Sequence, residues 1–310
     1  MDDITREIFR SWNWPDNGNC KYSHRPTPYN ISKFADFHPS SVYRRFNELF
    51  DFNFVRKVIY LPTDPIVKRK ALVFTGAKHE DISEMVSKME EFPFLEMIHY
   101  AHVYRSFGGL EHLNIGDSII FAEIIGTREV DIIARSRKLL DVLGEQVRIT
   151  VLPPSKTNKE STLDPKLVIL ARNLSYRDIY TNRLSDIAAP LNVSPRTAER
   201  LLDSLLSRNM LIAFPLLNQS EIKGFNVAVV SIPTLEDVDP IALKKLIMGL
   251  PMLSQRYLLY RLIDGTLNLL LYYEAPKELD ECVDELSPLF RTFAVLTRFE
   301  TYMNDHIILR

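Results

Sequence analysis

Several features that would mark a specialised class of protein are scarce in this sequence. Its 310 residues include two cysteines, Cys20 and Cys282, too few and too far apart for a disulfide framework or a thiolate metal site. With 10 glycines and 18 prolines, the sequence has neither the composition of collagen nor that of a low-complexity chain. No apolar run reaches the roughly 18 residues of a membrane span, and the N-terminus MDDITREIF is acidic rather than signal-like. We therefore expect a globular, cytoplasmic protein with no membrane partner.

The sequence also lacks an overall excess of one charge, because its net charge is −2. The local distribution is uneven. Residues 21–70 hold ten Lys or Arg against four Asp or Glu, and residues 166–215 hold seven against four. Residues 71–160 hold ten against 14, and residues 219–310 hold nine against 13. Positive charge is thus concentrated in two stretches, as expected where a protein contacts phosphates.

An internal repeat links these two basic stretches. The segment 38–46 aligns with the segment 194–202 at a separation of about 156 residues, and the apolar positions keep their spacing without a gap. The aligned apolar pairs are Val42 with Ala198, Phe46 with Leu202, Leu49 with Leu205, and Val55 with Leu211. Order and spacing together predict a tandem duplication.

The first module of each copy has the pattern of a winged helix-turn-helix. In the first copy, helical spacing predicts helices at 2–12, 29–36 and 39–51. Segments 54–61 and 210–217 are rich in β-branched and aromatic residues, which favours wing strands after the third helix of each copy. Three helices, a tight turn and trailing strands describe a winged helix-turn-helix head.

The second module of each copy alternates strands and helices in the order βαββαβ. This order predicts a ferredoxin-like antiparallel sheet covered on one face by two helices, so the fold class is α+β. In the first copy the predicted strands are 70–75, 95–104, 118–125 and 146–152, with helices at 80–92 and 128–142. In the second copy the predicted strands are 225–232, 256–263, 266–273 and 293–302, with helices at 239–249 and 277–290.

Five segments follow from these patterns. They are a first winged helix-turn-helix (1–66), a first ferredoxin-like domain (67–154), a linker (155–163), a second winged helix-turn-helix (164–219) and a second ferredoxin-like domain (220–310).

The order of these parts resembles the Lrp/AsnC family of transcription regulators. The resemblance is carried by the two helix-turn-helix stretches and by a Gly-Asp turn within 114–123, whose counterpart in 263–271 has Asp and Gly exchanged. It implies double-stranded DNA as a partner, and an amino-acid-like effector bound near Gly116 and Asp117. A tight turn that needs glycine explains Gly116 equally well. The resemblance also implies an intrachain pseudo-dimer of the ferredoxin-like domains, with a homodimer or a larger assembly left open.

The third helix of each head supplies the predicted DNA contacts. Arginine reads guanine and asparagine reads adenine, while Ser and Tyr are typical phosphate partners. The predicted contacts are Ser40, Ser41, Tyr43, Arg44, Arg45 and Asn47 on the first helix, Arg56 and Lys57 on the wing, and Arg196, Thr197 and Arg200 on the second helix. Alternatively, some of these arginines only pair with Glu48 or Asp51. The second head is less basic and has Glu199 in its reading face. An alternative interpretation is that this head has lost DNA binding and only packs against the first.

Siroheme decarboxylase subunits resemble this domain order too, which raises an enzymatic alternative. Its candidate cluster is the segment 99–105 plus His112. On the predicted strand His99 and His102 point to opposite faces, while His102 and Tyr104 share a face. A plain sheet-face role for His102 and Tyr104 is the simpler interpretation. Cys20 and His24 lack the further ligands of a zinc site.

The sequence therefore favours a transcription regulator of Lrp/AsnC type that reads an asymmetric operator through two unequal heads. We expect no catalytic residues, no metal and no cofactor. A tetrapyrrole enzyme on the same scaffold, or a ligand sensor that has lost DNA binding, is the alternative.

Overall fold

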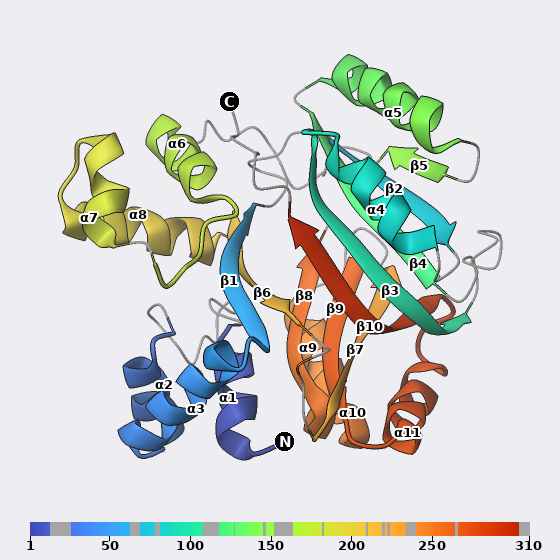
Figure 1. Cartoon of the computed structure of the whole chain (residues 1–310). Helices are drawn as coiled ribbons and strands as arrows, with labels where there is room; N and C mark the ends of the chain where they lie inside the picture. Colours follow the sequence, from blue (N-terminus) through green and yellow to red (C-terminus); the bar gives the residue numbers. More distant parts are fainter. Residues whose placement is uncertain are drawn as a thin grey trace.

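The structure is a computed structural model of the whole chain (Figure 1). It describes residues 1–12, 26–62, 69–77, 81–107, 118–126, 128–144, 147–151, 164–181, 183–208, 210–218, 221, 224–233, 240–263 and 266–303.

The first head consists of three helices, α1 (Asp3–Ser11), α2 (Pro28–Ala35) and α3 (Pro39–Asp51). The side chain of Asp2 caps α1 by accepting a 2.7 Å hydrogen bond from Thr5 N. Such a cap satisfies one of the backbone donors that the first helical turn leaves unpaired. Proline at the first position of α2 and of α3 fixes where each helix begins, because its missing N–H is not needed there.

The second head has the same order of helices. It contains α6 (Pro165–Leu174), α7 (Leu184–Ala188), the short 3₁₀ helix η2 (Ala189–Leu191) and α8 (Pro195–Ser207). The Ser194 hydroxyl caps α8 by accepting a 3.2 Å hydrogen bond from Thr197 N. Like α3, α8 begins with a proline and buries one apolar face.

The strands that follow the two reading helices pair with each other. β1 (Val55–Pro62) and β6 (Leu211–Leu217) form a two-stranded antiparallel ribbon in which Tyr60 lies opposite Ala213. The expected strand pair is therefore present, but each strand comes from a different head. The segment after α6 bonds to β1 as well: Tyr176 N–H donates to Tyr60 O (2.7 Å) and Ile179 N–H to Val58 O (2.8 Å).

Each ferredoxin-like module has the element order that the sequence predicts, with one addition. The first contains β2 (Arg69–Ala77), α4 (Ile82–Glu90), β3 (Leu95–Phe107), β4 (Ser118–Gly126), α5 (Glu129–Leu143) and β5 (Val147–Val151). The second contains β7 (Asn226–Pro233), α9 (Pro240–Gly249), α10 (Pro251–Arg256), β8 (Tyr257–Ile263), β9 (Thr266–Tyr273), α11 (Pro276–Leu286) and β10 (Phe293–Met303). The short helix α10 is the addition.

The two modules join edge to edge into one eight-stranded sheet with the order β5-β2-β4-β3-β10-β7-β9-β8. At the junction β3 pairs with β10, and His102 lies opposite Thr297. All pairings of this sheet are antiparallel. In Figure 1 the two heads lie on one side of the molecule and this sheet on the other.

One hydrophobic core runs through both heads and reaches the second module. It joins Ile8 and Phe9 of α1 to side chains of α3, α6 and α8, and to Leu270 and Tyr272 of β9. The neighbouring Leu269 and Leu271 point the other way, into the core under α9–α11. The heads therefore pack on the face of the second module that its helices leave uncovered.

The fold class that the sequence predicts is confirmed: the protein is α+β, with helix-turn-helix heads and ferredoxin-like antiparallel modules. The same element order occurs in both halves, while the duplication itself and the domain bounds stay predictions. The predicted linker 155–163 lies outside the described residues. Among the described residues, no helix is long and apolar enough to cross a lipid bilayer.

Tyr180, between α6 and α7, joins the two heads through its ring and its hydroxyl. Its ring contacts that of Phe46 on α3, with centroids 5.1 Å apart. Its hydroxyl accepts a 2.6 Å hydrogen bond from Trp12 Nε1 and donates to Pro26 O at 3.0 Å. Trp12, Pro26 and Phe46 all precede the second head in the chain. One side chain of the second head, Tyr180, therefore holds together three segments of the first half.

We expect Tyr180→Phe to lower the free energy of unfolding by about 1–3 kcal/mol, because the ring stays while the hydroxyl that serves two partly buried groups is lost. The measurement is urea unfolding followed by circular dichroism. The control is Tyr29→Phe, since the Tyr29 side chain is 59% exposed. Equal stability of the two variants would show that the Tyr180 hydroxyl does not hold the heads together.

Candidate nucleic-acid interface

The outward face of α3 presents polar side chains in one line. Helix α3 buries Val42, Phe46 and Leu49, so positions 40, 44 and 47 lie on the opposite side of the helix. Ser40, Arg44 and Asn47 are exposed, and the Arg44 side chain is 74% exposed. Arg44 Nε lies 3.8 Å from Glu48 Oε1, a long contact at the surface that fixes the guanidinium weakly.

The remaining predicted residues of α3 flank this line. Tyr43 is 46% exposed, and Ser41 is half-buried. The Ser40 hydroxyl lies 2.8 Å from Nδ1 of His38, which holds it at the start of the helix. The helix thus has hydroxyl, guanidinium and amide groups on one exposed surface. Groups of these kinds form hydrogen bonds with DNA phosphates and base edges.

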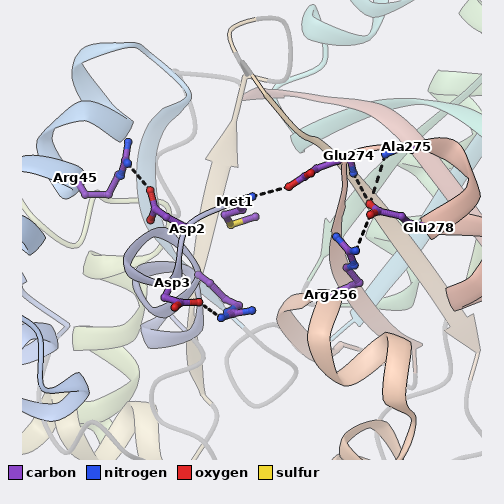
Figure 2. Close-up of polar contacts among 9 residues, drawn as sticks. Met1, Asp2, Asp3, Arg45, Arg256, Glu274, Ala275 and Glu278 are labelled. Atoms are coloured by element: carbon purple, nitrogen blue, oxygen red, sulfur yellow. Dashed lines mark hydrogen bonds and ion pairs between the residues drawn. The ribbon is translucent and has the colours of Figure 1, made fainter.

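Arg45 is placed differently from Arg44. Its guanidinium forms ion pairs with Asp2, at the start of α1, and with Glu48 (2.7 Å) on its own helix. Figure 2 shows the side chains of Arg45 and Asp2 pointing toward each other across the gap between the two helices. Burial raises the pKa of Asp2, but the hydrogen bonds from Thr5 and the charge of Arg45 outweigh burial and lower the pKa below its usual value.

The two basic residues predicted for the wing lie on β1. Arg56 is exposed and Lys57 is half-buried. Because β1 pairs with β6, their position is set by the other head rather than by a hairpin of their own.

Helix α8 offers a second, less basic surface. Arg196, Thr197, Glu199 and Arg200 are all exposed. The Thr197 hydroxyl lies 2.9 Å from that of Ser194 and takes part in the helix cap. Arg196 and Arg200 follow the outward line of α8 as Ser40 and Arg44 follow that of α3, while Glu199 brings a negative charge into this surface.

A different polar cluster surrounds His102 on β3. The Tyr100 hydroxyl lies 2.6 Å from His102 Nε2, and the Ser118 hydroxyl lies 3.3 Å from His102 Nδ1. Tyr100 and Ser118 are buried, while His102 is half-buried at the junction of the two modules. The ring is therefore held through both nitrogens.

Tyr104 and Arg105 bind across the same junction. Tyr104 donates to Asp280 Oδ1 of α11 at 3.0 Å, and Arg105 forms a 3.0 Å ion pair with the same oxygen. Burial and the Asp280 carboxylate raise the pKa of Tyr104. These contacts join the first module to the second.

His99 points to the face opposite His102, as the strand periodicity predicts. Its ring stacks on Phe121 (centroids 4.5 Å apart) and meets Phe214 of β6 at 6.3 Å. His99 is buried against these rings, and burial lowers its pKa to about 3 because it disfavours the charged form.

Several predicted residues lie outside the described part of the chain. These are Gly116, Asp117, His112, Cys20 and His24. Within the described residues, no three His, Cys, Asp or Glu side chains are grouped to hold a metal ion. Cys282 is buried, and burial raises the pKa of its thiol to about 12.

Two residues that organise the interface were not anticipated. A carboxylate just before an apolar periodic segment is a helix-start signal, which could have identified Asp2 as the cap of α1. Its contact with Arg45 joins α1 to α3 and has no local signal. Tyr180 lies in a segment without helical or strand periodicity, so its place between the heads follows only from the packing.

No protein-family model and no curated protein matches the sequence. Among solved structures, the siroheme decarboxylase NirDL is similar over 95% of this chain and 90% of its own, at 11% identity and a TM-score of 0.45. It was also solved with an iron-uroporphyrin III analogue.

Regulators of the AsnC type match about half of the chain. An AsnC-family regulator from Agrobacterium tumefaciens covers 49% of this chain and 89% of its own, at 13% identity and a TM-score of 0.33. A transcriptional regulator from Neisseria meningitidis, solved with L-Met, covers 52% and 95%, at 17% identity and a TM-score of 0.32. At such identities the likeness is one of fold.

One expectation is corrected by these comparisons. The sequence analysis predicts no enzyme, yet a solved structure that is similar over nearly the whole chain is that of an enzyme. The exclusion of enzymatic activity is therefore wrong as stated, and it is withdrawn. The low identity assigns no reaction to this chain.

The enclosed His99 predicts a pH-dependent stability. Below its unfolded pKa near 6.5 the unfolded chain binds a proton that the folded chain rejects down to about pH 3. The stability therefore falls as the pH is lowered through this window. Between pH 6 and pH 4 the free energy of unfolding of the wild type is expected to fall by about 2 kcal/mol more than that of His99→Phe. Urea unfolding at the two pH values measures it; identical pH dependence would contradict the assignment.

Proposed function

We propose that this protein binds double-stranded DNA through the outward face of α3, with α8 as a weaker second contact. The observation that carries the proposal is the exposed line of Ser40, Arg44 and Asn47 on a helix whose opposite side is buried in the head. The proposal leaves open whether the chain also has an enzymatic activity.

The chemistry of this line suits a DNA groove. Arg44 and Asn47 have the donors that read base edges, while Ser40 and Tyr43 have hydroxyls for phosphates. Arg56 on β1 adds an exposed cation beside the head. Residues 21–70, which contain most of this head, hold ten basic against four acidic residues, whereas both module stretches have an acidic excess. This partition favours attraction of phosphate by the heads.

The arrangement of the heads supports one fixed binding unit. The ribbon β1–β6 and the shared core hold α3 and α8 in one body, so both helices meet the duplex at a constant separation. Their outward residues differ, which favours an asymmetric operator over a palindrome. An amino-acid-like effector near Gly116 and Asp117 stays a prediction, as does pairing with a second chain.

The test is fluorescence anisotropy of a random-sequence duplex between about 50 and 300 mM salt. We expect a log–log slope of roughly −4 or steeper for the wild type, because several phosphates are contacted. On a random-sequence duplex the Arg44 guanidinium binds a phosphate rather than a particular base, so Arg44→Ala is expected to weaken binding about tenfold and to make the slope shallower by about 0.9. The matched control is Arg137→Ala, an exposed arginine of α5 in the first module. No binding at 50 mM salt, or equal binding by the two variants, would refute the proposal.

A second candidate function rests on the network around His102. A tyrosine hydroxyl 2.6 Å from an imidazole can exchange a proton with it, and the ring is half-buried where the modules meet. Such a group suits acid–base chemistry on a small molecule. A tetrapyrrole carrying carboxylates is the ligand class to test, since the siroheme decarboxylase NirDL is similar in structure over most of this chain.

The probe is iron-uroporphyrin III, added to the purified protein while its visible absorbance is recorded. If the second candidate is right, the wild type shifts the main absorbance band, and His102→Ala weakens binding at least about fivefold. His38→Ala, in the first head, serves as the control. An unshifted band with the wild type, or equal binding by the two variants, would eliminate this candidate.

A further inference from the structure

We infer that Arg45 positions the reading helix rather than contacting DNA, and that Asp2 is therefore a determinant of DNA affinity. The inference rests on the proposed DNA binding by α3, and it assigns different tasks to two adjacent arginines. Arg44 contacts the nucleic acid. Arg45 holds α3 against α1.

The helical periodicity separates the two side chains. Successive residues of a helix are about 100° apart, so Arg45 points well away from the line of Ser40, Arg44 and Asn47. The Arg45 side chain is 37% exposed, half the exposure of Arg44, and both of its ion-pair partners lie in the same head. A contact to phosphate would require it to leave two carboxylates.

Asp2 is itself fixed, which makes it an effective anchor. Its carboxylate accepts a hydrogen bond from Thr5 N at 2.7 Å while it pairs with Arg45. The same carboxylate thus caps the start of α1 and pairs with Arg45 of α3. Because the cap geometry restrains the carboxylate, the ion pair costs less side-chain entropy than one between two mobile residues.

Helix α1 in turn is anchored to the second ferredoxin-like module. Arg10 donates to Ser254 O of α10 (3.2 Å) and lies over the ring of Tyr257 on β8 (4.6 Å). Ile8 and Phe9 are fully buried in the core that includes Leu258 of β8. Figure 2 shows α1 between α3 and the second module, where Glu274 accepts a 2.9 Å bond from the Met1 amino group. The orientation of α3 thus depends, through α1, on the second ferredoxin-like module.

The second head provides an internal comparison. Asp164 caps α6 by accepting from Lys166 N at 2.9 Å, as Asp2 caps α1. The residue of α8 that aligns with Arg45 is Leu201, which packs against the core of the heads. This position therefore points into the packing of its head in both copies, through an ion pair at Arg45 and through apolar contact at Leu201.

Asp2→Asn and Asp164→Asn form a matched pair of variants, since asparagine also caps helices well. In the anisotropy titration, removal of a negative charge near the duplex would by itself strengthen binding. If Asp2 positions α3, Asp2→Asn instead weakens binding about three- to tenfold with an unchanged salt slope, and Asp164→Asn changes it less than about twofold. Arg45→Leu weakens binding with the same unchanged slope.

The opposite result is equally clear. If Arg45 contacts phosphate, Asp2→Asn frees it and strengthens binding, while Arg45→Leu makes the slope shallower by about 0.9. Either observation would overturn the inference.

A second readout separates this inference from the proposed function. Amide hydrogen exchange of peptides from α3 is expected to be several-fold faster in Asp2→Asn than in Asp164→Asn, without DNA present. Unchanged exchange in α3 would also overturn the inference. If the wild type does not bind DNA while α3 loses protection only in Asp2→Asn, the proposed function fails and the positioning role of Asp2 stands.

Discussion

Strand β1 is hydrogen-bonded along both edges, and these bonds tie the first head to the second half of the chain. One edge pairs with β6 of the second head, and the other receives Tyr176 and Ile179 from the segment after α6. A strand bonded on both sides to distant residues is satisfied only when the two halves of the chain are together. The first head is therefore held where the second half places it.

This constraint gives the heads a common core and a common orientation. Trp12, Phe46 and Tyr180 close the space between the heads, and α1 carries the apolar contact onward to the uncovered face of the second module. Burial of such side chains is worth roughly 1.5–3 kcal/mol each, which far exceeds what the exposed ion pairs contribute. The charged contacts of Asp2 and Arg10 thus orient α1 and α3 within a body whose stability comes from apolar packing.

The elements were predictable because their signals are local. The helix over 39–51 and the strand over 266–273 have the bounds that periodicity and turn residues indicate, and most other elements differ by one to three residues. The larger departures concern relations between elements. The short helix α10 lacks the length for a periodic signal. The partner of β1 is set by long-range packing, so the expected strand pair within each head became a ribbon between heads.

The order of the helix-turn-helix and βαββαβ elements, the basic character of the first head and the outward position of six polar residues on the helix over 39–51 follow from the sequence alone. These residues are Ser40, Ser41, Tyr43, Arg44, Arg45 and Asn47. Each of these features follows from spacing and composition along a few turns or strands. Only the tertiary structure distinguished Arg45 from Arg44, because the carboxylate that binds Arg45 belongs to another helix. It also decided that the modules join through β3 and β10. Edge pairing and ion pairs between distant segments depend on where the chain brings them together, which no local pattern encodes.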